Sequence, residues 1–282
     1  MAETKESSVV ASRVLRKERT QMPKGNTARK KHVTPLKITE VGHSTMLIEM
    51  AGVKILTDPW FTDPILGIVT HPHSIGMRLE DLPELDAILI SHGHFDHCDL
   101  KAMAQMDKST AVIVPEEKTA ARIRKLGYSE ITVLTKWESR LVSRVCVTAL
   151  PAGHLAPECT YVISSGDSAV FFGGDTRYIK EFRRIGETFD LTVALLPVNG
   201  LSFPLIGKVV MDAVDAAEAA VQLKTRVAIP IHYNISLTVP FLKRLFDGRV
   251  TGTAELFAAE LKRRNRYVKV VVLNPGESWE NT

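Results

Sequence analysis

Hydrophobic and polar positions alternate along much of the chain from residue 36 onward, which predicts a series of short β-strands. The first three strands follow one another as a meander at residues 36–41, 45–50 and 53–57, with Gly42 and Gly52 in the turns. Several later runs are apolar almost throughout, as is typical of strands buried on both faces. The further predicted strands lie at residues 87–90, 111–114, 131–134, 161–164, 169–172, 191–196, 227–231 and 268–273, with a hairpin over 140–150.

Apolar residues at a spacing of three and four predict helices between these strands. The helices are expected at residues 99–104, 116–126, 179–185, 211–223, 239–246 and 253–264. Residues 61–83 are rich in proline and lack a regular period, so we expect an ordered surface loop or lid there. The order of the predicted elements is strands first and then alternating strands and helices, and this order occurs twice along the chain. It predicts an α/β fold with two sheets packed face to face and helices outside.

Charge is unevenly distributed along the chain. The net charge is +4, yet residues 1–31 alone contain nine Lys or Arg residues against three Glu. We therefore predict a disordered basic tail over residues 1–35 and a single domain over residues 36–282. A basic tail can contact nucleic acid or acidic membranes. However, no aromatic residue interleaves these charges as a base-stacking surface would require, so we favour a solvated arm.

The composition also bears on the compartment. No run of eighteen apolar residues occurs, and charges interrupt residues 1–19, where a signal peptide would need an apolar core. The cysteines, Cys98, Cys146 and Cys159, are odd in number and show no C-x-x-C spacing. We therefore expect reduced thiols and a cytoplasmic protein.

The strongest chemical signal is the segment HGHFDH at residues 92–97. It places His92, His94, Asp96 and His97 directly after the apolar strand 87–90. Asp99 follows as the N-cap of the next predicted helix, so the segment forms a tight loop at the carboxyl end of a strand. Imidazole nitrogens and carboxylate oxygens are the usual ligands of zinc and related divalent ions. Their density predicts a metal site.

Three more candidate ligands recur at strand ends. His154, Asp175 and His232 each come directly after a segment rich in Val, Ile, Leu or Phe. A single polar residue at such a place is usually satisfied within the core or a loop. Three of them in one chain with the HGHFDH segment favour a common site, and nearby glycines such as Gly153 and Gly174 allow close backbone approach.

The order of these residues, HxHxDH followed by His, Asp and His, resembles that of the metallo-β-lactamase superfamily over about residues 36–275. Further short segments are similar to the branch of microbial metal-dependent hydrolases related to ascorbate-6-phosphate lactonase. More distantly, they resemble the N-acylphosphatidylethanolamine phospholipase D. These segments are Gly42-His43-Ser44, Thr57-Asp58-Pro59-Trp60, Gly174-Asp175-Thr176, Leu196-Pro197-Val198 and Pro230-Ile231-His232-Tyr233-Asn234.

The resemblance implies an αββα sandwich with two divalent metal ions at one edge. It implies that His92, His94 and His154 hold one ion, that Asp96, His97 and His232 hold the other, and that Asp175 bridges them. Zinc is the expected metal, although manganese and iron accept the same ligands. A hydroxide shared by the two ions would be the nucleophile.

Other residues have expected roles around this centre. Asp96 is expected to orient the nucleophile or to protonate the leaving group, and His43 is a second catalytic candidate. Tyr233 and Asn234 are expected to contact substrate because they directly follow His232.

Asp58 is expected to hydrogen bond to ligand residues, as carboxylates around metal sites do. We expect Glu158 only to begin a strand. The roles of His71 and His73, in the proline-rich loop, stay open.

These expectations favour a binuclear hydrolase that cleaves a phosphodiester or a lactone or ester in a small molecule. One alternative is a phospholipase-D-like hydrolase of lipid head groups, because the predicted lid carries several apolar residues. Another alternative is a nucleic-acid-binding protein that acts through its basic tail. The sequence also leaves open whether the chain forms a homo-oligomer.

Overall fold

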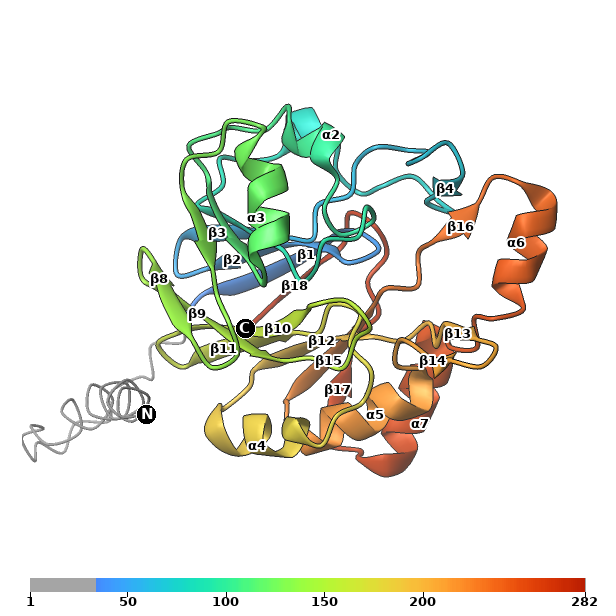
Figure 1. The fold of residues 1–282 in the computed structure, drawn as a ribbon. Coiled ribbons are helices and arrows are strands. Elements are labelled where there is room, and N and C mark those ends of the chain that lie inside the picture. The colour runs from blue at the N-terminus through green and yellow to red at the C-terminus, as the bar shows by residue number, and fades with distance from the viewer. Residues whose placement is uncertain (1–33, 282) are drawn as a thin grey trace, which may run out of the picture. The chain divides into compact units, whose positions relative to one another are not determined.

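A computed structural model describes residues 34–281 as two seven-stranded sheets that pack face to face (Figure 1). In spatial order, the first sheet consists of β18 (Ser278–Glu280), β1 (Leu36–Gly42), β2 (Thr45–Met50), β3 (Val53–Thr57), β5 (Ala87–Leu89), β6 (Ala111–Val114) and β7 (Ile131–Val133). The second consists of β17 (Lys269–Val270), β15 (Val227–Ile231), β12 (Val193–Pro197), β11 (Ser168–Phe172), β10 (Cys159–Ser165), β9 (Val145–Pro151) and β8 (Ser139–Val142).

Helices cover the outer faces of both sheets, which completes the predicted αββα sandwich (Figure 1). Over the first sheet lie α2 (Leu100–Met103) and α3 (Glu117–Arg124), and over the second lie α4 (Glu181–Thr188), α5 (Ala213–Gln222) and α7 (Ala254–Arg264). The helix α6 (Pro240–Asp247) projects from the sandwich and buries none of its residues. Small ribbons add β4 (Val69–Thr70) with β16 (Ser236–Leu237), and β13 (Ser202–Phe203) with β14 (Gly207–Lys208).

The period of two in the early strands separates two faces of the first sheet. Ile38, Ile48 and Ile55 point into the core between the sheets, whereas Leu47 and Leu56 face the other side. The central strands of the second sheet are buried on both faces because α4, α5 and α7 cover the outside. This explains why their sequences are apolar throughout.

The topology brings distant segments to one edge of the sandwich. β5 runs parallel to β3 and β6, and β12 runs parallel to β11 and β15. Parallel strands end at the same edge of a sheet, and ligand sites of open α/β sheets lie there. The segments after β5, β11 and β15 are the ones that carry the HGHFDH sequence, Asp175 and His232.

The two ends of the described chain differ from expectation in detail. The last predicted strand, residues 268–273, is reduced to β17, and an unpredicted strand, β18, pairs with β1. The predicted tail, residues 1–35, lies outside the described residues except for Thr34 and Pro35. Thr34 is tied to the domain, because its backbone N–H donates to Asp167 Oδ1 at 2.9 Å.

The proline-rich stretch is an ordered loop, as expected, with a short 3-10 helix η1 (Leu79–Asp81) and the strand β4. Trp60, Ile65 and Val69 anchor it in a small apolar cluster with Ile235 and Leu237. The loop is therefore packed against the segment that follows His232.

Candidate metal centre

The HGHFDH loop is held in place by hydrogen bonds at both ends. The backbone N–H groups of His97 and Cys98 donate to His94 O, which closes a tight turn. Asp99 caps α2 by accepting from Lys101 N and Ala102 N, and its other oxygen accepts from Thr62 N at 2.6 Å. The N-cap that was predicted from sequence thus also ties the loop to the proline-rich stretch.

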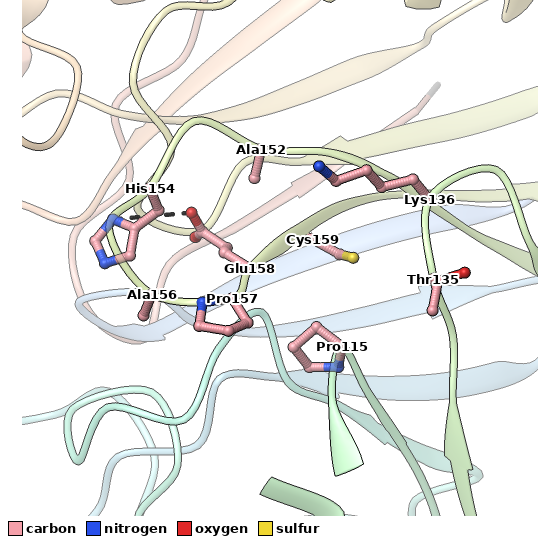
Figure 2. Close-up of a pocket in the computed structure, with 9 residues that line it drawn as sticks. All are labelled: Pro115, Thr135, Lys136, Ala152, His154, Ala156, Pro157, Glu158 and Cys159. Carbon is pink, nitrogen blue, oxygen red and sulfur yellow. Dashed lines mark ion pairs between the residues drawn. The ribbon is translucent and has the colours of Figure 1, made fainter. Parts of the chain in front are cut away.

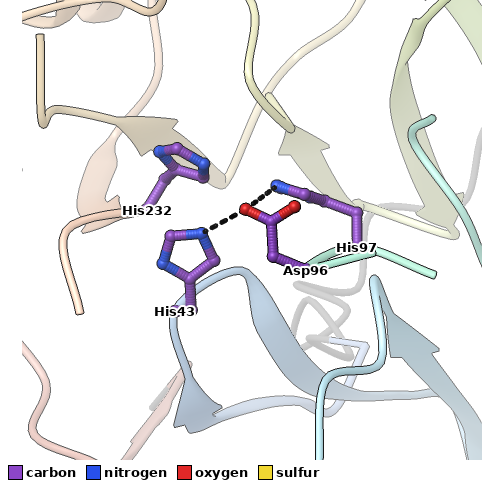
Figure 3. A group of neighbouring side chains, drawn as sticks. All are labelled: His43, Asp96, His97 and His232. Carbon is purple, nitrogen blue, oxygen red and sulfur yellow. Dashed lines mark ion pairs between the residues drawn. The ribbon is translucent and has the colours of Figure 1, made fainter. Parts of the chain in front are cut away.

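The structure brings all seven predicted ligands together. With His43 as an eighth residue, they form two groups of four. One group contains His92, His94, His154 and Asp175, and the other contains His43, Asp96, His97 and His232. Within each group, one potential ligand atom from every residue lies within 4.8 Å of the others. Figure 3 shows the second group, in which the side chains converge from the β1–β2 turn, the HGHFDH loop and the end of β15.

Asp175 lies between the two groups. Its Oδ1 is 2.7 Å from His232 Nε2 and 3.0 Å from His97 Nε2, while its Oδ2 is 3.8 Å from His92 Nε2. One carboxylate oxygen thus faces each group, which is the arrangement a bridging ligand needs.

The buried polar atoms of the site fit metal ions. Among the described residues, several buried atoms have no hydrogen bond of acceptable geometry: both ring nitrogens of His43, His154 and His232, together with His97 Nε2 and Asp175 Oδ1. Buried polar atoms are nearly always paired, so such a concentration calls for a partner of another kind. Neutral imidazoles and carboxylates are the donor set of divalent transition metals.

Electrostatics support the same interpretation. Burial, and then the nearby His232 and His97, lowers the pKa of His43 well below its usual value, and burial has the same effect on the pKa of His92. These imidazoles are therefore neutral, as metal ligands must be. Burial alone would also lower the pKa of His97. The carboxylates of Asp175, Asp58 and Asp96 outweigh this effect of burial and raise the pKa of His97 well above its usual value. The surroundings of His97 therefore favour a positive charge.

Asp58 fixes His97 of the HGHFDH loop and Ser91, the residue directly before the loop. Its Oδ2 is 2.6 Å from His97 Nδ1 and accepts from Ser91 Oγ, and its Oδ1 accepts from Ser91 N at 2.6 Å. An acceptor at Nδ1 places the ring proton there and leaves Nε2 free to face Asp175. The backbone of Asp58, His43 and His232 lies at positive φ (34°, 57° and 57°), a strained conformation that is often found at functional sites.

Glu158 belongs to the site, although we expected it only to begin a strand. Its Oε1 accepts from Asp175 N at 2.7 Å and lies 3.7 Å from His92 Nδ1, and its Oε2 lies 3.9 Å from His154 Nδ1. Burial, reinforced by the charge of Asp175, raises its pKa well above the usual value. The sequence feature that could have identified Glu158 is its position directly before an apolar strand. The predicted ligands were instead recognised by their positions directly after such strands.

The two predicted substrate contacts already have partners inside the protein. Asn234 is buried and donates from Nδ2 to Glu40 Oε1 at 2.7 Å, and the Tyr233 hydroxyl donates to Leu273 O. In this structure both residues hold the segment after His232 in place. Their contact with substrate stays a prediction.

The remaining candidates lie near the edge of the site. His71 is buried and stacks on Trp60 with ring centroids 3.8 Å apart, and Trp60 in turn contacts His43 edge-on. His73 is exposed. Burial raises the pKa of the Cys98 thiol to about 12, so this cysteine is a small core residue and not a reactive thiol.

None of the helices within residues 34–281 combines the length and the apolar character that a membrane span requires.

A fold of this type, with clustered His and Asp residues at one edge, defines a class of metal-binding α/β sandwiches. The family model of the beta-lactamase superfamily domain matches residues 53–233. The chain therefore belongs to the metallo-β-lactamase superfamily. The narrower resemblance to ascorbate-6-phosphate lactonase stays a prediction.

Several proteins are similar in sequence to this chain over most of its length. A UPF0173 metal-dependent hydrolase of Aeropyrum pernix is 29% identical over 266 residues, which cover 86% of this chain and 97% of the relative. Another, from Methanopyrus kandleri, is 26% identical over 257 residues, which cover 87% and 100%. Together with family membership, these relatives assign the chain to the metal-dependent hydrolases.

Solved structures give the same fold. Igni18, a metallo hydrolase from Ignicoccus hospitalis, is similar with a TM-score of 0.69 and 26% identity, covering 88% of this chain and 99% of that protein. An isothiocyanate hydrolase from Delia radicum gut bacteria has a TM-score of 0.70 at 23% identity, covering 86% and 98%, a likeness that concerns the fold alone.

Proposed function

We propose that this protein is a binuclear metal-dependent hydrolase that cleaves a phosphodiester or a lactone or ester bond in a small molecule. The observation that carries the proposal is the position of Asp175, whose two oxygens face two separate groups of ligand residues. A single-ion site would leave one of these groups, with its buried unpaired nitrogens, unexplained.

The residues divide between two ions in a simple way. His92, His94 and His154 would hold the first, Asp96, His97 and His232 would hold the second, and Asp175 would contribute one oxygen to each. His43 lies within reach of the second group and gives it a fourth side chain. Zinc is the metal we propose, with manganese and iron as the alternatives the ligands allow. When bound, two such ions supply Lewis acidity and a water of lowered pKa as nucleophile.

The chain's own groups orient this centre and move protons. Asp58 holds the ring of His97 through Nδ1 at 2.6 Å, and Ser91 Oγ holds the ring of His92 through Nδ1 at 3.0 Å, with Glu158 Oε1 3.7 Å from the same nitrogen. Asp96 is the candidate for proton transfer to the leaving group. Its side chain is 13% exposed, more than that of Asp175 at 8%, and its Oδ2 lies 3.9 Å from His43 Nε2 and 3.8 Å from His97 Nε2.

Space for a small substrate lies beside the first group. A cavity of about 430 Å³ is lined by His154, Glu158 and short side chains such as Ala152 and Ala156 (Figure 2). Cavities of this size commonly hold small-molecule ligands. This supports a small-molecule substrate rather than a polymer.

The test is metal analysis of the purified protein followed by assays with chromogenic phosphodiesters, lactones and thioesters. We expect two ions per chain in the wild type, fewer in His92→Ala and Asp175→Ala, and no turnover in either variant. A fully active protein without metal would refute the proposal. Lys262→Ala, an exposed change on α7, is the matched control and should keep both metal and turnover.

A further inference from the structure

The cavity beside His154 has a cation on its opposite side. In Figure 2 the side chain of Lys136 extends across the cavity, and its ammonium group points toward Ala152 on the side where Glu158 and His154 lie. Among residues 34–281, no hydrogen bond or ion pair engages this ammonium group. Lys136 is an exposed residue that lines the same cavity as the candidate ligand His154, so its ammonium group is open to a ligand that enters there.

The backbone beneath Lys136 is firmly held. Thr135 N donates to Glu138 Oε2 at 2.7 Å, and Trp137 N donates to Ala149 O at 2.6 Å. Trp137 adopts a positive φ of 72°, and the Arg184 guanidinium lies 4.2 Å from its ring centroid. The turn between β7 and β8 therefore fixes the backbone position from which the Lys136 side chain extends.

The other walls of the cavity combine short apolar side chains with the polar side chains of Thr135, His154 and Glu158. Pro115, Ala152, Ala156 and Pro157 are short and apolar. The Glu158 carboxylate also lines the cavity, but only 1% of its side chain is exposed, because Oε1 is bound to Asp175 N. Among the residues that line the cavity, none would present an exposed carboxylate to a negatively charged group that meets Lys136.

We propose that Lys136 binds an anionic group of the substrate, a carboxylate or a phosphate, at a distance from the bond that is cleaved. The proposal rests on the proposed hydrolytic function and narrows it to compact, negatively charged substrates. Lys136 would act on binding and specificity, because an ammonium ion recognises such groups through charge-assisted hydrogen bonds.

The experiment compares two esters that share a leaving group and differ in one terminal carboxylate, p-nitrophenyl hemisuccinate and p-nitrophenyl butyrate. In metal-loaded Lys136→Met, we expect kcat/KM for the hemisuccinate to fall about tenfold or more, mainly through KM, as for loss of a charge-assisted hydrogen bond. The value for the butyrate should stay within about twofold. Lys136→Arg should retain most of the preference, and Lys262→Met should change neither ester.

A binding measurement separates this proposal from the proposed function. Calorimetric titration of the metal-loaded protein with inorganic phosphate and with succinate should show a Kd about tenfold higher in Lys136→Met than in the wild type. Equal losses for both esters, or unchanged binding of both anions, would overturn the role of Lys136. If the wild type cleaves neither ester while anion binding still depends on Lys136, the result refutes hydrolysis of these esters and supports the anion-binding role of Lys136.

Discussion

The buried carboxylate of Asp58 offers a sharp test of how the site is built. Asp58→Asn keeps the shape of the side chain and removes its charge. Asn Oδ1 can still accept from Ser91 N, but its amide group then faces His97 Nδ1, where the carboxylate Oδ2 now lies at 2.6 Å. Two donors would meet, so the ring proton of His97 must move to Nε2, the atom that faces Asp175 at 3.0 Å.

The magnitude follows from these contacts. Changes to groups that orient a metal ligand typically cost about 10–100-fold in metal affinity. A buried donor that loses its acceptor costs about 1–3 kcal/mol in the free energy of unfolding. We therefore expect Asp58→Asn to lose the ion of the second group first, with metal content falling from two toward one per chain and with a lower Tm.

The assay is metal content after dialysis against zinc, chelator-competition titration, and thermal unfolding with and without metal. Asp86→Asn is the matched control, because within residues 34–281 the Asp86 carboxylate accepts a single, solvent-exposed hydrogen bond, from Lys54 N. Glu158→Gln should weaken the first group instead, since Glu158 lies against His92 and His154. Unchanged metal affinity and Tm in Asp58→Asn would refute this account of the site.

Three further outcomes are expected. Asp96→Asn should lower kcat by a factor on the order of 10²–10⁴, with a larger loss for poor leaving groups than for nitrophenolate. Equal losses for both kinds of leaving group would reduce Asp96 to a ligand. Burial raises the pKa of Glu40 to about 8 in the folded protein, above its unfolded value of 4.5, so the free energy of unfolding should fall as pH rises between those values. Glu40→Gln should remove that dependence and raise Tm at pH 8 more than at pH 5, and parallel curves for the two proteins would contradict it. Deleting residues 1–31 should leave Tm and turnover on a small substrate unchanged, because the apolar periodicity begins at residue 36. A large loss of either would show that the tail supports the domain.

Local patterns in the sequence predicted most of the strands and helices of the fold. The meander of β1 to β3 follows from alternation and glycine turns, and the α2 start follows from the Asp99 cap. The short ribbons and β18 escaped prediction. Two-residue strands carry no usable period, and β18 exists only because it meets the edge strand β1.

The sequence by itself determined which residue types could bind metal, because each of them lies in a dense segment or directly after an apolar strand. The resemblance to a known family also implied their division into two groups with Asp175 between them. Only the tertiary structure decided the contacts around these groups: His43 joins one of them, Glu158 lies against two rings, and Lys136 lines the cavity. Each of these relations joins segments far apart in the chain. Their distances are set by strand register and by the packing of the two sheets, which no local pattern of residues encodes.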